Sequence, residues 1–258
     1  MARPAANDEL VRQSGYVPER VRRAHAGNPI LALWRALWDS IIGKKVIMAV
    51  TGGVLVLFVV GHMLGMLKTF GGSAELNAYS MFLRQILQPA LGYGGALWFI
   101  RIVLLVCVVL HIAASVELTR VNQQARPIGY NTKRVVETTF AALTMRWSGA
   151  LLLVFIVFHL LNLSAGVAGF APGTFDPLNV YHNVVAGLSL WPVAAFYIVA
   201  MGALYLHLEH GLWSISQTLG WNTTRNVDTA KRDSRLIALA VAAGFASVPI
   251  AVLAGWIR

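Results

Sequence analysis

The chain has 258 residues, of which 57% are hydrophobic and only 12% are charged, with a mean hydropathy of +0.63. Soluble domains carry about 25% charged residues, so this composition excludes a soluble domain and indicates an integral membrane protein. A single cysteine excludes an internal disulfide and a four-cysteine zinc or iron–sulfur site built by this chain alone. The net charge of +10 does not indicate binding of nucleic acid, because the basic residues flank apolar segments. In that position they set the membrane topology or contact anionic lipid or a partner subunit.

Residues 1–45 form a basic N-terminal segment that we expect in the cytoplasm. Its first 28 residues are polar and Arg-rich and lack the apolar core of a signal peptide, so we expect no cleaved leader. Residues 30–42 are amphipathic, with Trp34 and Trp38 on one helical face. This pattern predicts an interfacial helix with tryptophan at the level of the lipid headgroups.

Residues 46–258 form a second domain that contains five apolar runs, each near the roughly 20 residues that a membrane-spanning helix needs. The sequence therefore predicts an all-α, integral membrane bundle of five transmembrane helices. The runs are Val46–Leu67, Trp98–Thr119, Trp147–Ala168, Trp191–Trp213 and Leu236–Ile257. Of the connections between them, residues 71–86 predict a short helix near the membrane surface, whereas residues 169–190 are rich in Gly, Pro and Asn and predict a loop.

The distribution of Lys and Arg predicts the orientation of this bundle. Eight precede the first run, five lie between the second and third runs, and four lie between the fourth and fifth. The opposite side has only Lys68, Arg84, Arg101 and Arg258. Because cytoplasmic loops carry the excess of positive charge, we expect the N-terminus in the cytoplasm and a multi-pass protein of the cytoplasmic (inner) membrane.

Three of the apolar runs each contain one histidine, His62, His111 or His159, and the fourth run contains His207, with His210 three residues later. The helix rise of 1.5 Å per residue gives the depth of each. On the outward-running first and third spans, His62 lies about 24 Å and His159 about 18 Å from the inner end. On the inward-running second and fourth spans, His111 lies about 12 Å and His207 about 9 Å from the inner end. The depths therefore predict an outer pair, His62 with His159, and an inner pair, His111 with His207.

Two imidazoles on separate helices are the axial ligands that a six-coordinate haem requires, and such a haem suits electron transfer. The alternative is that each histidine is a hydrogen-bonded contact between helices. A lone histidine fits both interpretations equally well. Four histidines that pair by depth favour two haems of the b type, stacked across the membrane.

At these residues the chain resembles the cytochrome b membrane-anchor subunit of succinate:quinone oxidoreductases, the five-helix, di-haem type also found in quinol:fumarate reductases. The resemblance covers roughly residues 40–258. It is carried by IGKKVIMAVTGG at 42–53, GHMLG at 61–65, HIAASVELTRVNQQARP at 111–127, WSGALLLVFIVFHLLNL at 147–163 and HLEHGLWSISQTLGWN at 207–222.

The resemblance implies that His62 and His159 hold the distal haem and that His111 and His207 hold the proximal one. It also implies a flavoprotein with FAD and an iron–sulfur subunit docked on the cytoplasmic face, with quinone, often menaquinone, as the acceptor. Succinate oxidation would then belong to the partner subunits, and quinone reduction to the membrane part of the complex.

Two residues depart from a simple four-ligand pattern. His210 lies three residues past His207, and the following Gly-Leu-Trp favours His207 as the ligand, which leaves His210 for a propionate or quinone. Cys107 precedes His111 by one helical turn, so both side chains can face one cavity. A buried thiol is usually a small apolar side chain. The other interpretation makes Cys107 a metal ligand, in a mixed Cys/His iron–sulfur site that replaces a haem.

Quinone reduction requires hydrogen bonds to the carbonyl groups and a proton donor near the inner haem. The candidate residues at that level are Ser40, Lys44, Lys45, Glu209, His210, Trp213 and Ser214. Glu209 fits a proton relay and an ion pair with a nearby arginine equally well. For the haem propionates, Arg120 and Arg146 have the required charge and position, although interfacial anchoring explains either one alone.

Three other classes of protein remain as alternatives. Quinol-oxidising cytochromes b place two ligands on each of two helices, whereas here each of four helices supplies one. A transporter or proton channel would favour broken helices and an inverted repeat, and neither is apparent. A haem-free or iron–sulfur-containing anchor that binds quinone remains open. The number of haems, the direction of the reaction, the quinone and the oligomeric state, including a higher oligomer, are not decided by the sequence.

Overall fold

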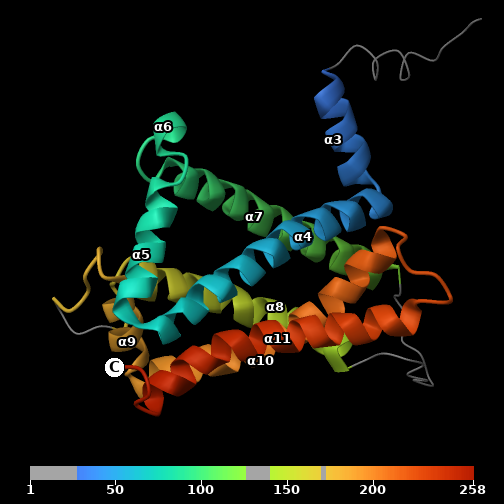
Figure 1. The fold of residues 1–258 in the computed structure, drawn as a ribbon. Helices are drawn as coiled ribbons and strands as arrows, with labels where there is room; N and C mark the ends of the chain where they lie inside the picture. Colours follow the sequence, from blue (N-terminus) through green and yellow to red (C-terminus); the bar gives the residue numbers. More distant parts are fainter. Residues whose placement is uncertain (1–27, 126–139, 170–172) are drawn as a thin grey trace, which may run out of the picture. The chain divides into compact units, whose positions relative to one another are not determined.

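The computed structural model describes residues 28–125, 140–169 and 173–258, and within these ranges the chain is helical with no strand (Figure 1). The chain divides into two compact units, residues 1–45 and residues 46–258, which we describe separately. Much of the basic N-terminal segment and the basic connection at 126–139, on which the predicted orientation depends, lie outside the described residues.

Helix α3 (Pro29–Asp39) belongs to the N-terminal unit. The Asn28 side chain accepts a hydrogen bond from the Ile30 amide at 2.9 Å, and Pro29 occupies the first turn, where a missing amide proton costs nothing. The Trp34 and Trp38 rings stack with centroids 5.5 Å apart. The helix is therefore present where the amphipathic pattern predicts it, and its place at the membrane interface stays a prediction.

The five predicted membrane spans are confirmed as helices that are long and apolar enough to cross a membrane. They are α4 (Ile41–Met66), α7 (Gly95–Gln124), α8 (Phe140–His159), α10 (Trp191–Thr218) and α11 (Val227–Leu253). Several exceed the predicted apolar runs, most clearly α11, which begins nine residues before Leu236. The polar residues of such extensions are stable in a helix because its backbone hydrogen bonds are satisfied internally in water and in lipid alike.

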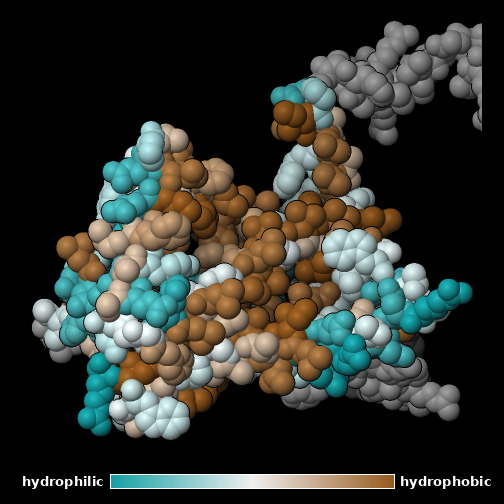
Figure 2. Space-filling view, in the orientation of Figure 1, coloured by the Kyte–Doolittle hydropathy of each residue, from teal (hydrophilic) through white to brown (hydrophobic). Residues whose placement is uncertain are grey.

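Helix α10 is the centre of the packing in the helical unit. It lies closely against α11 along its length and against α8. Leu208 of α10 joins Ala238 and Val241 of α11 in a buried cluster, against which Val56 and Met63 of α4 also pack. Figure 2 shows that apolar residues cover the middle of these helices while hydrophilic residues gather at their two ends, as expected for a bundle that meets lipid in its middle.

Short helices cover one end of the long ones (Figure 1). A 3₁₀ turn (Leu67–Gly71) leads from α4 into α5 (Gly72–Gln85), which agrees with the predicted surface helix, and α6 (Gln88–Leu91) precedes α7. Helix α9 (Val180–Leu188) contacts α5. Asn77 of α5 donates to the Asn179 side chain at 2.9 Å and accepts from the Tyr181 amide at 3.0 Å.

The loop predicted for residues 169–190 is wrong over its second half, where α9 forms. The Asn179 side chain accepts a hydrogen bond from the His182 amide at 3.0 Å and so caps the helix. Val184 and Leu188, one helical turn apart, are both buried in the core. Gly169, Gly173 and Pro177 lie before the cap, whereas Asn183 and Gly187 lie within the helix.

Candidate functional site

The four histidines of the membrane spans meet as two pairs in the structure. The rings of His62 (α4) and His159 (α8) have centroids 5.8 Å apart. The rings of His111 (α7) and His207 (α10) have centroids 6.2 Å apart. Each pair joins two helices that are far apart in the sequence, and these are the two pairs that equal depth predicts.

Hydrogen bonds hold the His111 ring from its Nδ1 side. Nδ1 lies 3.1 Å from the Met48 carbonyl oxygen and 3.3 Å from Thr51 Oγ1. The Thr51 hydroxyl itself donates to the Ile47 carbonyl at 2.7 Å. Because a carbonyl oxygen can only accept, Nδ1 must carry the proton, and Nε2 keeps its lone pair.

The His207 ring is held in the same way from the neighbouring helix α8. Its Nδ1 lies 3.5 Å from Ser148 Oγ, at the long end of the hydrogen-bonding range, and the Ser148 hydroxyl donates to the Met145 carbonyl at 3.1 Å. With its proton used in this way, the hydroxyl is left as an acceptor for His207 Nδ1–H. Nε2 of His207 is therefore also left with a lone pair.

In the outer pair, a hydrogen bond holds the His159 ring, whereas aromatic side chains pack against the His62 ring. Nδ1 of His159 lies 3.2 Å from the Tyr197 hydroxyl, which donates to the fully buried Asn162 Oδ1 at 2.9 Å. Asn162 lies in a π-helical turn (Leu160–Ser164) that follows α8, and its amide donates to the Ala168 carbonyl at 2.7 Å. The His62 ring packs between Phe58 and Phe245, with centroids 5.4 and 5.5 Å away.

Two glycines provide the space for the inner pair. A Cβ atom on Gly52 would lie 3.1 Å from His111 Cε1, and one on Gly149 would lie 3.4 Å from His207 Cε1. Each glycine directly follows the hydroxyl residue beside the same ring, Thr51 or Ser148. Helices α4 and α8, which carry the outer pair, therefore also contact the inner pair. Thr51-Gly52 of α4 lies beside His111, and Ser148-Gly149 of α8 lies beside His207.

The donor chemistry of both pairs fits a haem. Metal–imidazole bonds are about 2 Å long, so two rings that ligate one iron from opposite sides have centroids about 6 Å apart. Both pairs meet this spacing. A ligating imidazole ordinarily donates its other ring N–H to a carbonyl or similar acceptor, as His111 does with Met48. Among the described residues, no three His, Cys, Asp or Glu side chains gather in one place. Each pair offers two imidazoles to one iron, whose other ligands a haem macrocycle would supply.

Comparison with protein families identifies the chain. Residues 122–250, half of its 258 residues, match the family model described as succinate dehydrogenase/fumarate reductase transmembrane subunit. The chain belongs to this family. The matched part includes His159 and His207, whereas His62 and His111 precede it. Comparisons with curated proteins and with solved structures gave no match.

This transmembrane subunit of a succinate dehydrogenase/fumarate reductase is a multi-pass membrane protein, and its described residues include five helices that are long and apolar enough to cross a membrane. Of the other predicted site residues, several gather near the end of α10. The rings of His210 and Trp213 have centroids 6.0 Å apart, and Lys231 lies 5.3 Å from the Trp213 ring centroid. Within the described residues, His210 Nδ1 and Trp213 Nε1 are buried without a hydrogen-bond partner. Ser214, on the same helix, is half-buried.

The other predicted residues have the following surroundings. Glu209 accepts from Arg235 Nε at 3.0 Å, which is the ion pair weighed against a proton relay. Arg120 pairs with Glu117 at 2.9 Å, and Arg146 is exposed. Cys107 is a half-buried free thiol. In the N-terminal unit, Ser40 Oγ accepts from the Gly43 amide at 2.8 Å at the start of α4, and Lys44 and Lys45 follow.

The residues that sequence reasoning missed are those that hold the rings: Thr51, Gly52, Ser148, Gly149, Asn162 and Tyr197. A signal for the first four exists, since Thr-Gly and Ser-Gly steps inside apolar spans let helices approach closely and hydrogen-bond across the interface. Asn162 and Tyr197 also lie in apolar runs as polar residues. Which histidine each one serves depends on helix rotation, which the sequence does not specify.

We expect Tyr197→Phe to lower the free energy of unfolding by about 1–2 kcal/mol, because it removes the hydroxyl between His159 and the buried Asn162. Denaturant titration of the purified protein in detergent measures this. Tyr93→Phe is the matched control, since its hydroxyl contacts only Met81 Sδ, at 3.9 Å, and the residue is exposed. Equal effects of the two substitutions would contradict the role of the Tyr197 hydroxyl.

Proposed function

We propose that this transmembrane subunit is a b-type cytochrome that passes electrons from a cytoplasmic flavoprotein and iron–sulfur partner to quinone in the cytoplasmic membrane. The proposal rests above all on the two cross-helix histidine pairs, each spaced for one iron atom. Family membership supports the partner subunits and their FAD and iron–sulfur clusters. Menaquinone as the quinone rests on the resemblance alone.

Each haem would be held by one pair, His62 with His159 toward the outer side and His111 with His207 toward the inner side. When bound, haem b supplies reversible one-electron transfer at an iron with no open coordination position. The chain's own contribution is to fix the rings. The acceptors at Nδ1 of His111, His207 and His159 orient each imidazole and make its Nε2 a stronger ligand.

The arrangement of ligands favours this function over the other b-type cytochromes. Each of α4, α7, α8 and α10 would supply one ligand, whereas the quinol-oxidising cytochromes b place two ligands on each of two helices. A site in which Cys107 and His111 hold an iron–sulfur cluster would need further ligands. The described residues bring no such group together, so other residues of the chain or a partner subunit would have to supply them.

Quinone would bind near the inner end of α10. His210 Nδ1 and Trp213 Nε1 are buried polar atoms that lack partners, and a ring N–H is the donor that a quinone carbonyl requires. Lys231 beside Trp213 adds positive charge where the reduced quinone oxygen would become negative. Glu209, held by Arg235, and Ser214 are candidates on α10 for delivering protons. Ser40 and Lys44 of the N-terminal unit stay candidates on the sequence alone.

We expect Trp213→Phe and His210→Ala each to lower kcat/KM for a soluble quinone analogue by about twofold to tenfold, the loss of one hydrogen bond. The haem spectrum should not change, because neither residue is a proposed ligand. Trp221→Phe is the control, since Trp221 is exposed. If kcat/KM for the quinone analogue is unaffected by both α10 substitutions, the quinone does not bind there.

The decisive experiment is a dithionite-reduced minus oxidised spectrum of the purified subunit complex, with haem, iron and acid-labile sulfide measured per polypeptide. Two b-type haems per chain are expected. One haem, with iron and sulfide in excess of the partner's clusters, would favour the Cys107 site instead. The absence of haem would leave a quinone-binding anchor.

A further inference from the structure

A pocket opens at the start of α7, away from all four histidines. It has a volume of about 190 Å³ and is lined by Arg84, Tyr93, Gly94, Leu97, Trp98 and Arg101. By the predicted orientation this is the outer end of the span. The haem and quinone proposals use none of these residues.

The backbone between α5 and α7 builds the pocket. Gly94 has a left-handed φ of 74° and caps α7, and its amide donates to the Arg84 carbonyl at 2.7 Å. Leu87, also left-handed with φ 57°, starts the short helix α6 between them. Because a left-handed conformation is strained for leucine, the surrounding structure must hold this turn in place. The turn brings the end of α5 against the start of α7.

Two guanidinium groups line the pocket without a carboxylate. Arg84 uses Nη1 on Ser80 Oγ at 2.9 Å and Nη2 on the Pro177 carbonyl at 3.2 Å, so part of its five-donor fork stays free. The Arg101 guanidinium carbon lies 5.0 Å from the Trp98 ring centroid, one turn back toward the predicted outer end. Neither arginine forms an ion pair with any described residue, in contrast to Lys68, which pairs with Glu75 at 2.8 Å.

The walls of the pocket point to a lipid. Tyr93 is 56% exposed and Trp98 is 62% exposed, as aromatic residues at a membrane interface are. Further along α7, Ile102, Leu105 and Val109 are exposed as well, and they offer an apolar surface to acyl chains. A soluble anion would use the two arginines and leave this surface bare. A neutral quinone would leave two positive charges uncompensated.

We propose that this pocket binds the phosphate of an anionic phospholipid in the outer leaflet, with its acyl chains along α7. Arg84 and Arg101 contact the phosphate oxygens, for which the planar guanidinium is well suited. Tyr93 and Trp98 flank the glycerol region. The proposal does not depend on haem or quinone binding, since its residues lie outside both sites.

Native mass spectrometry of the purified complex tests the site, after extensive detergent washing and titration with phosphatidylglycerol. We expect one tightly bound phosphatidylglycerol per chain whose affinity falls about fivefold for R84Q or R101Q and about 25-fold for both. R84K/R101K should lose less than R84Q/R101Q, because it keeps the charge, but it should still bind more weakly than the wild type, because lysine lacks the planar fork. Phosphatidylcholine should bind more weakly, and inorganic phosphate should not displace the lipid.

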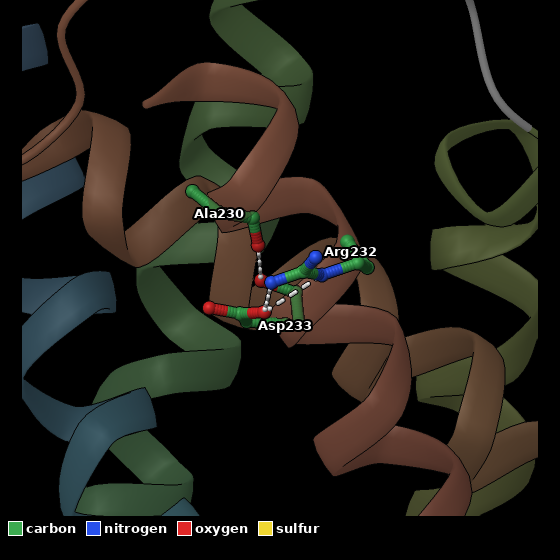
Figure 3. Close-up of polar contacts among 4 residues, drawn as sticks. Ala230, Arg232 and Asp233 are labelled. Carbon is green, nitrogen blue, oxygen red and sulfur yellow. Dashed lines mark hydrogen bonds and ion pairs between the residues drawn. The ribbon is translucent and has the colours of Figure 1, made fainter. Parts of the chain in front are cut away.

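R225Q/R232Q is the matched control, because it removes the same charge at the predicted cytoplasmic end. Arg232 is already paired there, its Nε and Nη2 each 3.2 Å from Asp233 Oδ1 (Figure 3). The proposal is overturned if this control weakens phosphatidylglycerol binding as much as R84Q/R101Q does. It is also overturned if phosphatidylcholine binds as tightly, or if inorganic phosphate competes, which would indicate a site for a soluble anion.

Discussion

The His207→Ala protein should contain one b-type haem, against the two that we propose for the wild type, because the inner haem would lose one of its two histidine ligands. His111→Ala should remove the same haem, since the two rings face each other with centroids 6.2 Å apart. The double variant His111→Ala/His207→Ala should therefore lose no more haem than either single variant. Combining His207→Ala with His159→Ala should remove both haems. Pyridine haemochrome assays and low-temperature difference spectra measure haem content and resolve the two components.

His210→Ala is the sharpest control for this experiment, because His210 is three residues from His207 on the same helix. It should retain both haems. His182→Ala, on α9 and outside the four spans, should retain both as well. If His210→Ala loses a haem and His207→Ala keeps both, the ligand assignment on α10 is wrong. If the double variant loses twice as much as each single variant, His111 and His207 serve different sites.

Gly52→Val should displace the inner haem although Gly52 is not a ligand. A Cβ atom at this position would lie 3.1 Å from His111 Cε1, and the γ-methyl groups would push the ring away from His207. Overpacking of a tight site costs about 1–3 kcal/mol, which corresponds to roughly fivefold to 150-fold weaker haem binding. Gly149→Val should also weaken binding of the inner haem, by displacing the His207 ring, but less strongly, because a Cβ atom there would lie 3.4 Å from His207 Cε1.

Gly53 directly follows Gly52 in the sequence and offers a closely matched control. A Cβ atom there meets nothing within 4 Å, so Gly53→Val makes the same chemical change in the same helix without touching His111. Haem occupancy of the three glycine variants can be compared by titrating haem into the purified protein after mild extraction. A loss in Gly53→Val equal to that in Gly52→Val would mean that the effect comes from the helix rather than from the ring.

Hydropathy and helix geometry explain how much of this molecule is predictable. The five apolar runs predict five helices, because only a helix satisfies its backbone hydrogen bonds within lipid over such a length. The constant rise of the helix turns sequence position into depth. That is why His62 can be matched with His159, and His111 with His207, before any coordinates are known.

Other parts of the structure were beyond this reasoning. Helix α9 has a local Asn179 cap, but its stability also depends on the burial of Val184 and Leu188, which follows from where α5 and α11 lie. The assignment of Thr51 to His111 and of Ser148 to His207 depends on how α4 and α8 are rotated. In a span that is apolar on all sides, the hydrophobic pattern carries little information about rotation, because every face is acceptable to lipid or to a neighbouring helix.

By itself, therefore, the sequence determined the class of the protein, the number of its spans, their expected orientation and the depth of each histidine. These properties depend on hydropathy, charge and the rise of a helix, all of which are local. The tertiary structure alone decided which side chains hold the rings, which glycines make room for them and which arginines converge at the start of α7. Those properties depend on the rotation and packing of separate helices, such as α4 and α7 at Thr51 and His111, which are 60 residues apart in the chain.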